Sequence, residues 1–491
     1  MLLWVRRLFE SRWLIVIPLL IYVGLAAGRI ATKAPWCDEA WFASSAVNLV
    51  RKGFMGNTIL ADETGFPELH RYTYWLPPMY FLAEALTFKV AGVGLLQIRF
   101  ISLLWGLAGL LAVWGLTAKF FGNNRGLCFL SAMLVGTNFF YIKSASDARM
   151  DMMAASLSLI GLWIYLSMRD RSLPRAVLLS NTFVCLSGLT HPNGLLGLLV
   201  LLFMMVHLDR HRMSRRTILM GLVPYVVGGM GWGIYISQDF DAFQHQLLPN
   251  ILGRGQANIV GSVYNEIVSR YLGCHGFLGV ESIIERAPAP ILVFYFLCFL
   301  SYPLVARGKD QLLWRMLVIF FLGLMFLAGN KTCSYLVWIE PFFLLNALAV
   351  WRRMNNSRYV NALFMLAFSY ILLFSLASNI YTIARNEYAE EYLPDMRTFN
   401  SSYYQGGLIY GGAEIAFFYD FDDQMFQDDN RLGFRTGVRP DYLAISPGYR
   451  ANFKRYKESE PEAWGYINAT LEEDYHVVFE GHAYTFYRKK S

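Results

Sequence analysis

The chain has 491 residues, of which 55% are hydrophobic and 16% are charged, and its net charge is +7. Globular proteins average about 45–50% apolar and about 25% charged residues, so this composition excludes a disordered chain, a collagen, a coiled coil and a small disulfide scaffold. The net charge is no sign of a nucleic-acid partner unless the basic residues gather on one face. Long apolar stretches recur from Leu14 to Ser378 and predict a polytopic α-helical membrane protein.

A helix needs about 20 mostly apolar residues to cross the hydrocarbon core of a membrane. The stretches that approach this length are 13–28, 98–118, 126–142, 149–168, 176–190, 192–207, 217–237, 289–306, 312–329, 333–351 and 359–379. They predict eleven spans, with twelve or thirteen as alternatives. The stretch 76–93 opens with two prolines and carries Glu84 and Lys89, so we expect an amphipathic helix at the outer interface there.

Short loops rich in Lys and Arg tend to stay in the cytoplasm. Six such clusters occur, at Arg6/Arg7/Arg12, Lys119/Arg125, Arg169/Arg171/Arg175, Arg210/Arg212/Arg215/Arg216, Arg307/Lys309/Arg315 and Arg352/Arg353/Arg358. Placing all of them inside predicts a cytoplasmic (inner) membrane protein whose N-terminus is inside. The exported, periplasmic or extracytoplasmic segments are then 29–97, 143–148, 190–193, 238–288, 330–332 and everything after 380. A cleaved signal peptide in place of the first span is an open alternative and leaves the later segments exported.

The last 112 residues differ from the rest in charge. Residues 380–491 hold 12 Lys and Arg against 18 Asp and Glu, a balance of −6, which leaves +13 on residues 1–379. This predicts a transmembrane catalytic domain over 1–379 and an exported soluble α/β domain over 380–491. In that domain, 406–411 and 476–487 have the patterns of strands and 456–464 that of a helix.

Acidic residues stand close to two predicted helix starts on the exported side. Asp38 and Glu39 precede an apolar helical pattern over 39–52, so Asp38 is expected at the N-cap and Glu39 in the first turn. Asp147 is likewise expected as an N-cap, with Asp151 one turn further in. Two alternatives stay open: Asp38 serves only as a cap, or Asp151 only forms an ion pair with Arg149 or Lys143.

Polar groups in other exported turns fall on the same predicted side. They are His191 and the turn 330–332 with Lys331, followed by Tyr335 and Glu340. Lys331 either contributes to a site or extends its ammonium to the lipid headgroups, and Glu340 needs a partner at membrane depth. Carboxylates can act as a general base or bind a divalent cation, while cations stabilise a phosphate leaving group. These groups therefore predict transfer from a phosphorylated donor to a hydroxyl or an amine.

The six cysteines show no CxxC pair and no metal-ligand spacing. Cys37 and Cys274 both fall in exported segments, where a disulfide would persist. Unpaired cysteines are the favoured alternative.

The segment Trp36-Cys37-Asp38-Glu39-Ala40-Trp41-Phe42-Ala43 resembles the Asp-Glu loop of the protein O-mannosyltransferase superfamily. This superfamily includes the bacterial lipid A aminoarabinose transferases and other family 39-type glycosyltransferases of the GT-C fold. Further matches follow in the same order over about residues 1–380: Leu76-Pro77-Pro78-Met79-Tyr80-Phe81, Gly92, Arg99, Ala148-Arg149-Met150-Asp151, Thr190-His191-Pro192-Asn193-Gly194, Lys331, Tyr335 and Pro341.

The resemblance implies an inverting hexosyl- or pentosyltransferase that uses a polyprenyl-phosphate sugar as donor. The expected acceptor is a lipid, a glycan or a protein, and membrane lipids are the other partners. Asp38 is implied to be the general base, assisted by Glu39, with Asp151 lining the pocket. Lys331 and Tyr335 are implied to hold the donor phosphate, where Arg149 and His191 are further candidates.

The chain departs from the aminoarabinose transferases at Trp75-Leu76, where those enzymes have a Glu-Lys pair before the proline. This argues against aminoarabinose as the sugar and leaves a metal ligand at that place in doubt. A divalent cation (Mg²⁺, Mn²⁺, Ca²⁺ or Zn²⁺) stays open without assigned ligands, and no organic cofactor is expected. The alternative functions are a transporter or flippase, whose acids would couple ions, and a polysaccharide polymerase or ligase of the cell envelope.

Overall fold

The computed structural model describes residues 12–61, 66–252, 258–278, 286–305, 311–329 and 331–490. The chain divides into two compact units. Unit 1 comprises residues 1–27, 102–238 and 249–381, and unit 2 comprises residues 28–101, 239–248 and 382–491. The first predicted exported loop therefore groups with the C-terminal tail. The predicted boundary near residue 380 separates a transmembrane domain from an exported domain, and it stays a prediction.

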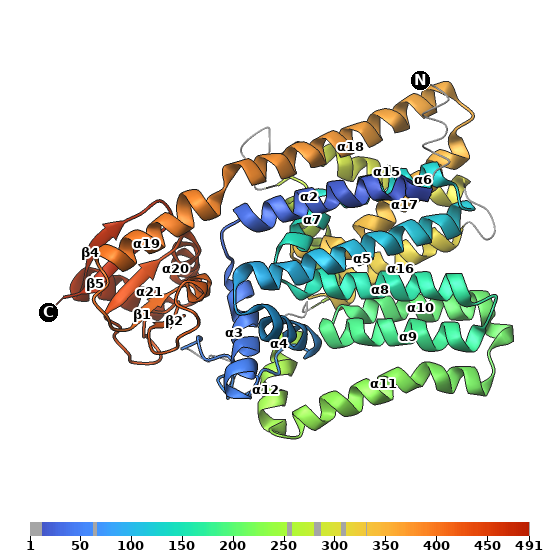
Figure 1. Ribbon diagram of the computed structural model, residues 1–491. Helices are drawn as coiled ribbons and strands as arrows, with labels where there is room; N and C mark the ends of the chain where they lie inside the picture. Colours follow the sequence, from blue (N-terminus) through green and yellow to red (C-terminus); the bar gives the residue numbers. More distant parts are fainter. Residues whose placement is uncertain are drawn as a thin grey trace. The chain divides into compact units, whose positions relative to one another are not determined.

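Long apolar helices build unit 1 and run alongside one another (Figure 1). The α-helices of unit 1, which also include shorter ones, are α2 (Val16–Thr32), α5 (Leu95–Phe121), α6 (Arg125–Thr137), α7 (Phe139–Ser146), α8 (Met150–Met168), α9 (Leu173–Thr190), α10 (Gly194–Asp209), α11 (Arg215–Ile236), α13 (Ile259–Asn265), α15 (Ala289–Val305), α16 (Gln311–Leu327), α17 (Glu340–Met354) and α18 (Arg358–Arg385). The helix α12 (Phe240–Leu252) contributes to both units, as α2, α5 and α18 do. Within unit 1, α9 packs against α8, α10 and α11.

Every one of the eleven predicted spans overlaps a helix. Six described helices are long and apolar enough to cross a membrane, or seven if the bent pair α6–α7 counts as one span. The helices α15 and α16 are strongly apolar but have 17 residues each. A multi-pass membrane protein is thus confirmed, while the number eleven stays a prediction. Helix α4 (Met79–Ala91), expected at the interface, has 13 residues and is too short to span.

Two of the predicted spans are broken. The helices α6 and α7 meet at an angle of 59°, where the Asn138 side chain accepts hydrogen bonds from the amides of Phe140 and Tyr141 and caps α7. The stretch 333–351 begins as a 3₁₀ helix, η5 (Cys333–Trp338), and continues as α17, which has Pro341 in its first turn. At both breaks, polar side chains therefore lie at the start of a helix in the interior of unit 1.

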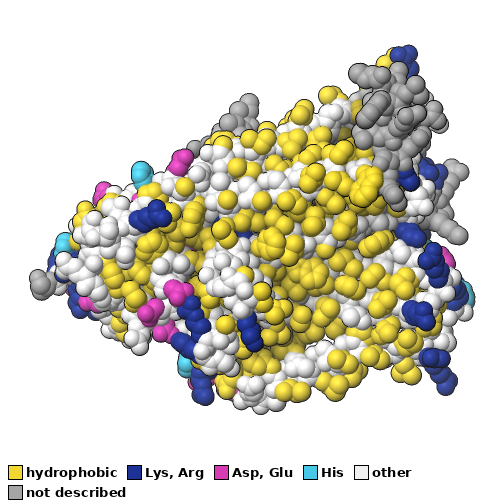
Figure 2. All heavy atoms as spheres, viewed as in Figure 1, with side chains coloured by type: hydrophobic (Ala, Val, Ile, Leu, Met, Phe, Trp, Pro, Cys, Tyr) yellow, Lys and Arg dark blue, Asp and Glu magenta, His cyan; other side chains and the backbone are white. Residues whose placement is uncertain are grey.

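Side chains are sorted by type along the helices. Hydrophobic side chains cover the flanks of the long helices, and Lys and Arg gather at one end of the helices of unit 1 (Figure 2). On α11 the large apolar side chains are exposed, including Ile218, Leu219, Leu222, Val223, Val226 and Val227. An exposed apolar face of this length is the surface expected to contact lipid.

Unit 2 contains α3 (Cys37–Lys52), α4 and the C-terminal tail. The tail has the helices α19 (Leu393–Ser402), α20 (Pro447–Ser459) and α21 (Pro461–Ala469), and the strands β1 (Ile409–Gly411), β2 (Phe426–Gln427), β3 (Tyr442–Ile445), β4 (Tyr475–Glu480) and β5 (Thr485–Lys489). The sheet order is β2-β1-β3-β5-β4, with β1 parallel to β2 and β3, and β5 antiparallel to β3 and β4. The small C-terminal sheet with its helices agrees with the prediction, but the helix expected over 456–464 is two helices that meet at Glu460.

The tail contacts the first loop through one buried acid. The Asp428 carboxylate accepts hydrogen bonds from Trp41 Nε1 at 2.8 Å and from the Tyr449 hydroxyl at 2.5 Å. Its backbone amide donates to the Ile59 carbonyl, and its carbonyl accepts from the Ala61 amide. Burial raises the pKa of Asp428 to about 7, although both donors oppose this shift. This acid ties α3, which carries Asp38 and Glu39, to the tail.

Candidate active site

Asp38 lies in the first turn of α3 and is not its cap. The helix starts at Cys37, and the N-cap residue is Trp36. The Glu39 carboxylate accepts a hydrogen bond from the Trp36 amide at 2.8 Å and so satisfies the helix start. The expectation that Asp38 is the N-cap, including the alternative that it serves only as a cap, is therefore wrong. The Asp38 carboxylate is half-buried, and the Cys37 Sγ lies 3.8 Å from it.

Glu39 is fully buried and pairs with Arg99 of α5. The guanidinium donates from Nε to Glu39 Oε1 at 2.8 Å and from Nη2 to Oε2 at 2.7 Å. It also donates to the carbonyls of Ile30, in the last turn of α2, and of Lys33 and Ala34, which come just after that helix. This bidentate pair fixes the start of α3 against the end of α2. These contacts hold the Glu39 side chain in place next to Asp38.

A second buried acid lies near Glu39 in unit 2. Glu84 of α4 has no exposed surface, and neither of its carboxylate oxygens has a hydrogen-bond partner among the described residues. Burial raises its pKa well above the usual value, and the Glu39 charge adds to this shift. This environment favours the neutral form of the Glu84 carboxyl.

Asp151 opens a chain of contacts in unit 1. Arg149 Nε lies 2.9 Å from Asp151 Oδ2, and His191 Nε2 lies 3.8 Å from Asp151 Oδ1. The Tyr335 hydroxyl is 3.4 Å from the same His191 nitrogen. The structure thus brings together four of the predicted site residues, and the expected Arg149–Asp151 ion pair is present.

The other N-cap prediction fails at α8 for a local reason. The N-cap of α8 is Arg149, whose amide donates to the Asp147 carbonyl at 2.8 Å. Asp147 itself ends α7 as its C-cap. Because the connection between the two helices is short, Asp147 still belongs to the end of α7 and does not cap α8. Asp151 lies in the first turn of α8.

Lys331 is buried and paired, so the alternative that it extends to lipid headgroups is wrong. Its Nζ lies 3.0 Å from Glu266 Oε2 and donates to the carbonyls of Leu324 and Met325 at the end of α16. Such carbonyls have no partner within their own helix and attract a cation. Burial lowers the pKa of the Lys331 ammonium, and the Glu266 carboxylate opposes that shift.

Glu266 also holds a second buried cation. Arg270 Nη1 lies 2.7 Å from Glu266 Oε1, and both side chains are fully buried. The Arg270 guanidinium stands 5.6 Å from the ring centroid of Tyr335. Two cations and one carboxylate leave this group a formal charge of +1. We call Glu266, Arg270, Lys331 and Tyr335 the cation cluster.

A disulfide fixes the segment that carries the cluster. It joins Cys274, which follows Arg270, to Cys333, which follows Lys331. Because Cys274 is bonded to Cys333, neither the predicted pairing of Cys37 with Cys274 nor the favoured alternative of unpaired cysteines is correct. The bond holds Arg270 and Lys331 near each other although they lie far apart in the sequence.

Glu340 has partners inside unit 1, as membrane depth requires. His275 Nε2 lies 3.5 Å from Glu340 Oε1, and the Asn138 side-chain amide donates to Oε2 at 3.3 Å. The Nδ1 of His275 contacts the Tyr271 carbonyl at 2.9 Å. The break between α6 and α7 thus supplies one of the two partners.

Sequence patterns missed the role of Glu266. It and Arg270 lie four residues apart, the spacing of neighbours on a helix face, and this was the available signal. Asn330 of the predicted turn 330–332 lies outside the described residues. Asp38 and Glu39 belong to unit 2, whereas Asp151, Arg149, His191, Lys331 and Tyr335 belong to unit 1.

The described residues do not supply a metal site. No group of three or more His, Cys, Asp or Glu side chains in the described ranges is arranged to hold a metal ion. The Asp151–His191 and Glu340–His275 pairs each offer two such ligands, and a closed protein site normally uses more.

Comparisons with known proteins agree with this architecture. Residues 76–230 match the family described as dolichyl-phosphate-mannose-protein mannosyltransferase. Comparison with curated protein sequences gives no significant match. The fold is similar to that of ArnT from Cupriavidus metallidurans bound to undecaprenyl phosphate, with 13% identity and a TM-score of 0.61 over 97% of this chain and 98% of that chain.

Two further solved structures have related folds. The oligosaccharyltransferase of Archaeoglobus fulgidus in complex with Zn and sulfate is 12% identical, with a TM-score of 0.56 over 97% of this chain and 73% of that chain. The mycobacterial arabinofuranosyltransferase AftD is 10% identical, with a TM-score of 0.51 over 98% of this chain and 40% of that chain. At such identities the likeness shows the fold, which is GT-C. The resemblance first indicated by Trp36–Ala43 is confirmed.

Proposed function

We propose that this chain is an integral-membrane glycosyltransferase that transfers a monosaccharide from a polyprenyl-phosphate donor to an acceptor on the outer face of the cytoplasmic membrane. The family match over 76–230 and the GT-C fold support the reaction class. The similar protein ArnT was solved with undecaprenyl phosphate, which supports a lipid-phosphate ligand. The observation that carries the proposal is the cation cluster, whose two buried cations share one carboxylate.

The cation cluster is proposed to bind the donor phosphate. During transfer, the bond between the anomeric carbon and the phosphate oxygen breaks, and the oxygen keeps the electron pair. The phosphodiester becomes a phosphate monoester with one additional negative charge. Lys331 and Arg270 would stabilise that charge, and Tyr335 would donate a hydrogen bond. Because the leaving group is already stable as an anion, the reaction needs no general acid.

Asp38 is proposed as the general base. It would take the proton from the acceptor hydroxyl or amine as that atom forms its bond to the anomeric carbon from the opposite face, which inverts the configuration. Glu39 is saturated by Arg99 and the Trp36 amide, so it would position the start of α3 and not exchange protons. Asp151, with Arg149 and His191, would line the donor side. No step is routed through a metal ion, because the described residues do not fit one.

The sugar and the acceptor can be identified in cells. A strain that lacks this gene should lose one defined glycosyl modification of an envelope lipid, glycan or protein, seen by mass spectrometry as the loss of a hexose or pentose mass. The wild-type gene should restore it. Normal modification together with the accumulation of an unflipped lipid-linked precursor would instead indicate the transporter alternative, and a shift in glycan chain length would indicate the polymerase.

Replacing Lys331 by Ala should weaken donor use. The substitution removes one of two cations at the proposed phosphate site, and a charge-assisted hydrogen bond contributes about 1.5–3 kcal/mol. We expect the apparent KM for the donor to rise by about tenfold or more, with the acceptor KM unchanged. The measurement is the initial rate of transfer in membranes at varied donor concentration.

Two variants control this measurement. Lys331→Arg keeps the charge and should recover most of the donor affinity. Lys454→Ala makes the same change at an exposed lysine of α20 and should have no effect. An unchanged donor KM in a folded Lys331→Ala protein would remove Lys331 from the phosphate site.

A further inference from the structure

A cavity lies at the opposite end of unit 1 from Asp151. It has a volume of about 660 Å³ and is lined by Lys119, Phe120, Phe121, Gly122, Leu166, Arg169, Asp170, Leu208, Tyr302, Leu312, Leu313, Ala349, Arg352 and Arg353. Asp151 starts α8 and Arg169 follows its end, so the two are separated by about 27 Å along the helix, at 1.5 Å per residue. We call this cavity the basic cavity. None of the residues of the cation cluster lines it.

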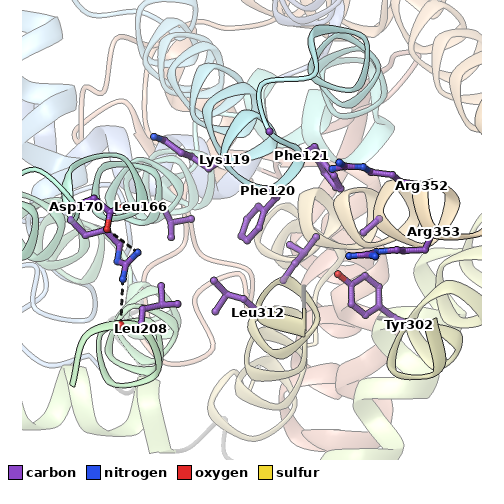
Figure 3. A pocket seen from close by; sticks show the side chains of 14 residues that line it. Lys119, Phe120, Phe121, Leu166, Asp170, Leu208, Tyr302, Leu312, Arg352 and Arg353 are labelled. Atoms are coloured by element: carbon purple, nitrogen blue, oxygen red, sulfur yellow. Dashed lines mark hydrogen bonds and ion pairs between the residues drawn. The ribbon is translucent and has the colours of Figure 1, made fainter. Parts of the chain in front are cut away.

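Four of the fourteen described lining residues are Lys or Arg, and one is an acid. Figure 3 shows Lys119 on one side, Arg352 and Arg353 on the other, and Phe120 and Leu312 between them. Lys119 has no carboxylate within ion-pair distance among the described residues, and Arg352 stands over the Phe121 ring at 5.9 Å. Three predicted cytoplasmic clusters thus meet at one end of the helices.

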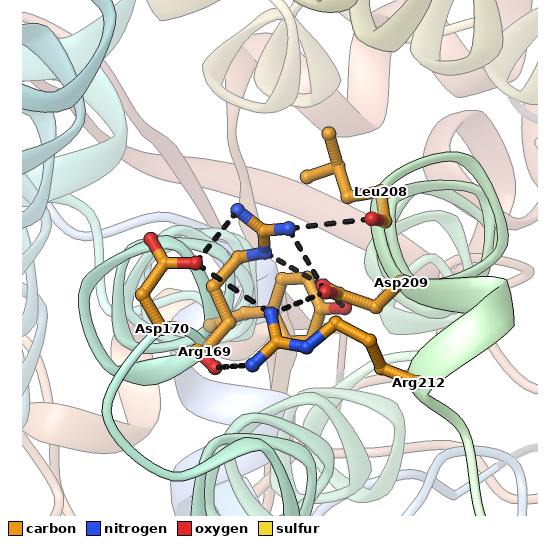
Figure 4. Close-up of polar contacts among 6 residues, drawn as sticks. Arg169, Asp170, Leu208, Asp209 and Arg212 are labelled. Carbon is orange, nitrogen blue, oxygen red and sulfur yellow. Dashed lines mark hydrogen bonds and ion pairs between the residues drawn. The ribbon is translucent and has the colours of Figure 1, made fainter.

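The fourth cation is held in place by acids. The Arg169 guanidinium binds the buried Asp209 carboxylate at 2.6 and 2.9 Å and lies 3.3 Å from Asp170 (Figure 4). Arg212 reaches the same two acids at 2.9 and 3.6 Å, and the Tyr165 hydroxyl donates to Asp209 at 2.7 Å. Two cations and two acids make this corner neutral and rigid. Outside this corner, the described lining contributes the cations Lys119, Arg352 and Arg353 and no further acid.

The other walls are apolar. Leu166, Leu208, Leu312 and Leu313 stand at the ends of helices whose flanks are covered by hydrophobic side chains (Figure 2). A ligand that satisfies both kinds of wall has an anionic head and a hydrocarbon body. A free anion would use the cations but would leave the apolar wall without a partner.

We propose that the basic cavity binds the phosphate headgroup of an anionic membrane phospholipid. Lys119 and the Arg352–Arg353 pair would bind the phosphate oxygens from two sides, and the first methylenes of the acyl chains would lie on the leucines. Basic pockets between transmembrane helices on the cytoplasmic side recognise lipid headgroups in this way. The inference does not depend on the proposed glycosyl transfer.

The test uses the full chain purified in mild detergent, with bound lipid counted by native mass spectrometry. The probes are phosphatidylglycerol, phosphatidylcholine and inorganic phosphate. We expect one phosphatidylglycerol to be retained in preference to phosphatidylcholine, and an excess of inorganic phosphate not to displace it. The double variant Arg352→Gln/Arg353→Gln should bind phosphatidylglycerol about tenfold or more weakly.

Two further variants make the test specific. Lys119→Gln changes one charge and should weaken binding in the same direction. Arg215→Gln/Arg216→Gln removes two exposed arginines from the start of α11, outside the cavity, and should bind like wild type. Equal retention of the two lipids by wild type, displacement by free phosphate, or an equal loss in the α11 variant would overturn the proposal.

Discussion

Replacing Asp38 by Asn is expected to abolish sugar transfer while the protein still folds. A positioned general base contributes about 10²- to 10⁴-fold to the rate, and Asn cannot accept the acceptor proton. Because Trp36 is the N-cap of α3 and Glu39 satisfies its start, the helix does not need the Asp38 carboxylate as a cap. The loss of a first-turn charge should cost about 0.3–1 kcal/mol of stability. The measurements are transfer activity in membranes and the midpoint of thermal unfolding.

Asp241→Asn provides the matched control. Asp241 is also an acid in the first turn of a helix, α12, but its side chain is 83% exposed. The control should keep full activity. A loss confined to Asp38→Asn would then show that the effect comes from the position of Asp38 and not from an Asp-to-Asn change as such. Near-wild-type transfer by a folded Asp38→Asn protein would mean that another group is the base.

Replacing Arg99 by Gln should destabilise unit 2 strongly. The Arg99 and Glu39 side chains are both 0% exposed, so the variant leaves a buried carboxylate without its Arg99 counter-charge. Breaking a buried pair on one side costs about 3–5 kcal/mol. The carbonyls of Ile30, Lys33 and Ala34 also lose their donor. We expect a large drop in the thermal midpoint and loss of activity, since the start of α3 would no longer be fixed.

The exposed pair Arg51–Asp420, with side chains 37% and 71% exposed, is the comparison. Arg51→Gln should cost about 0–1 kcal/mol, because water already solvates both charges. The double variant Glu39→Gln/Arg99→Gln should be more stable than Arg99→Gln alone, since it removes the orphaned charge. Stability of Arg99→Gln close to that of wild type would show that Glu39 has another partner.

The apolar stretches predict the long helices of unit 1, because burying such a stretch or immersing it in lipid needs no particular partner, whereas none of them predicts α12, α13 or α19. The breaks at Asn138 and before Glu340 escaped this reasoning. In both places the apolar pattern continues across the break. The helix is interrupted there because a polar side chain makes hydrogen bonds with other groups of unit 1. The two N-cap predictions failed for a similar reason. The preference of Asp for the N-cap position is weaker than the hydrogen bond that the Glu39 carboxylate accepts from the Trp36 amide, and weaker than the constraint of the short α7–α8 connection.

The sequence by itself determined which residues are chemically unusual. Asp38, Glu39, Asp151, Lys331 and Glu340 stand out because ionisable groups are costly at membrane depth and therefore rare there. The cost of burial requires that each such group have a partner, but it does not say which one. Partners distant in the sequence become neighbours only when the helices pack.

Only the tertiary structure decided those partners. It pairs Glu39 with Arg99, places Glu266 between Arg270 and Lys331, and brings His275 next to Glu340. The disulfide between Cys274 and Cys333 shows the same limit, since Cys37 and Cys274 are the cysteines of the predicted exported segments and Cys333 starts a predicted span. The scarce charges of a strongly apolar chain are thus predictable as sites, while their pairing is a property of the packed helices.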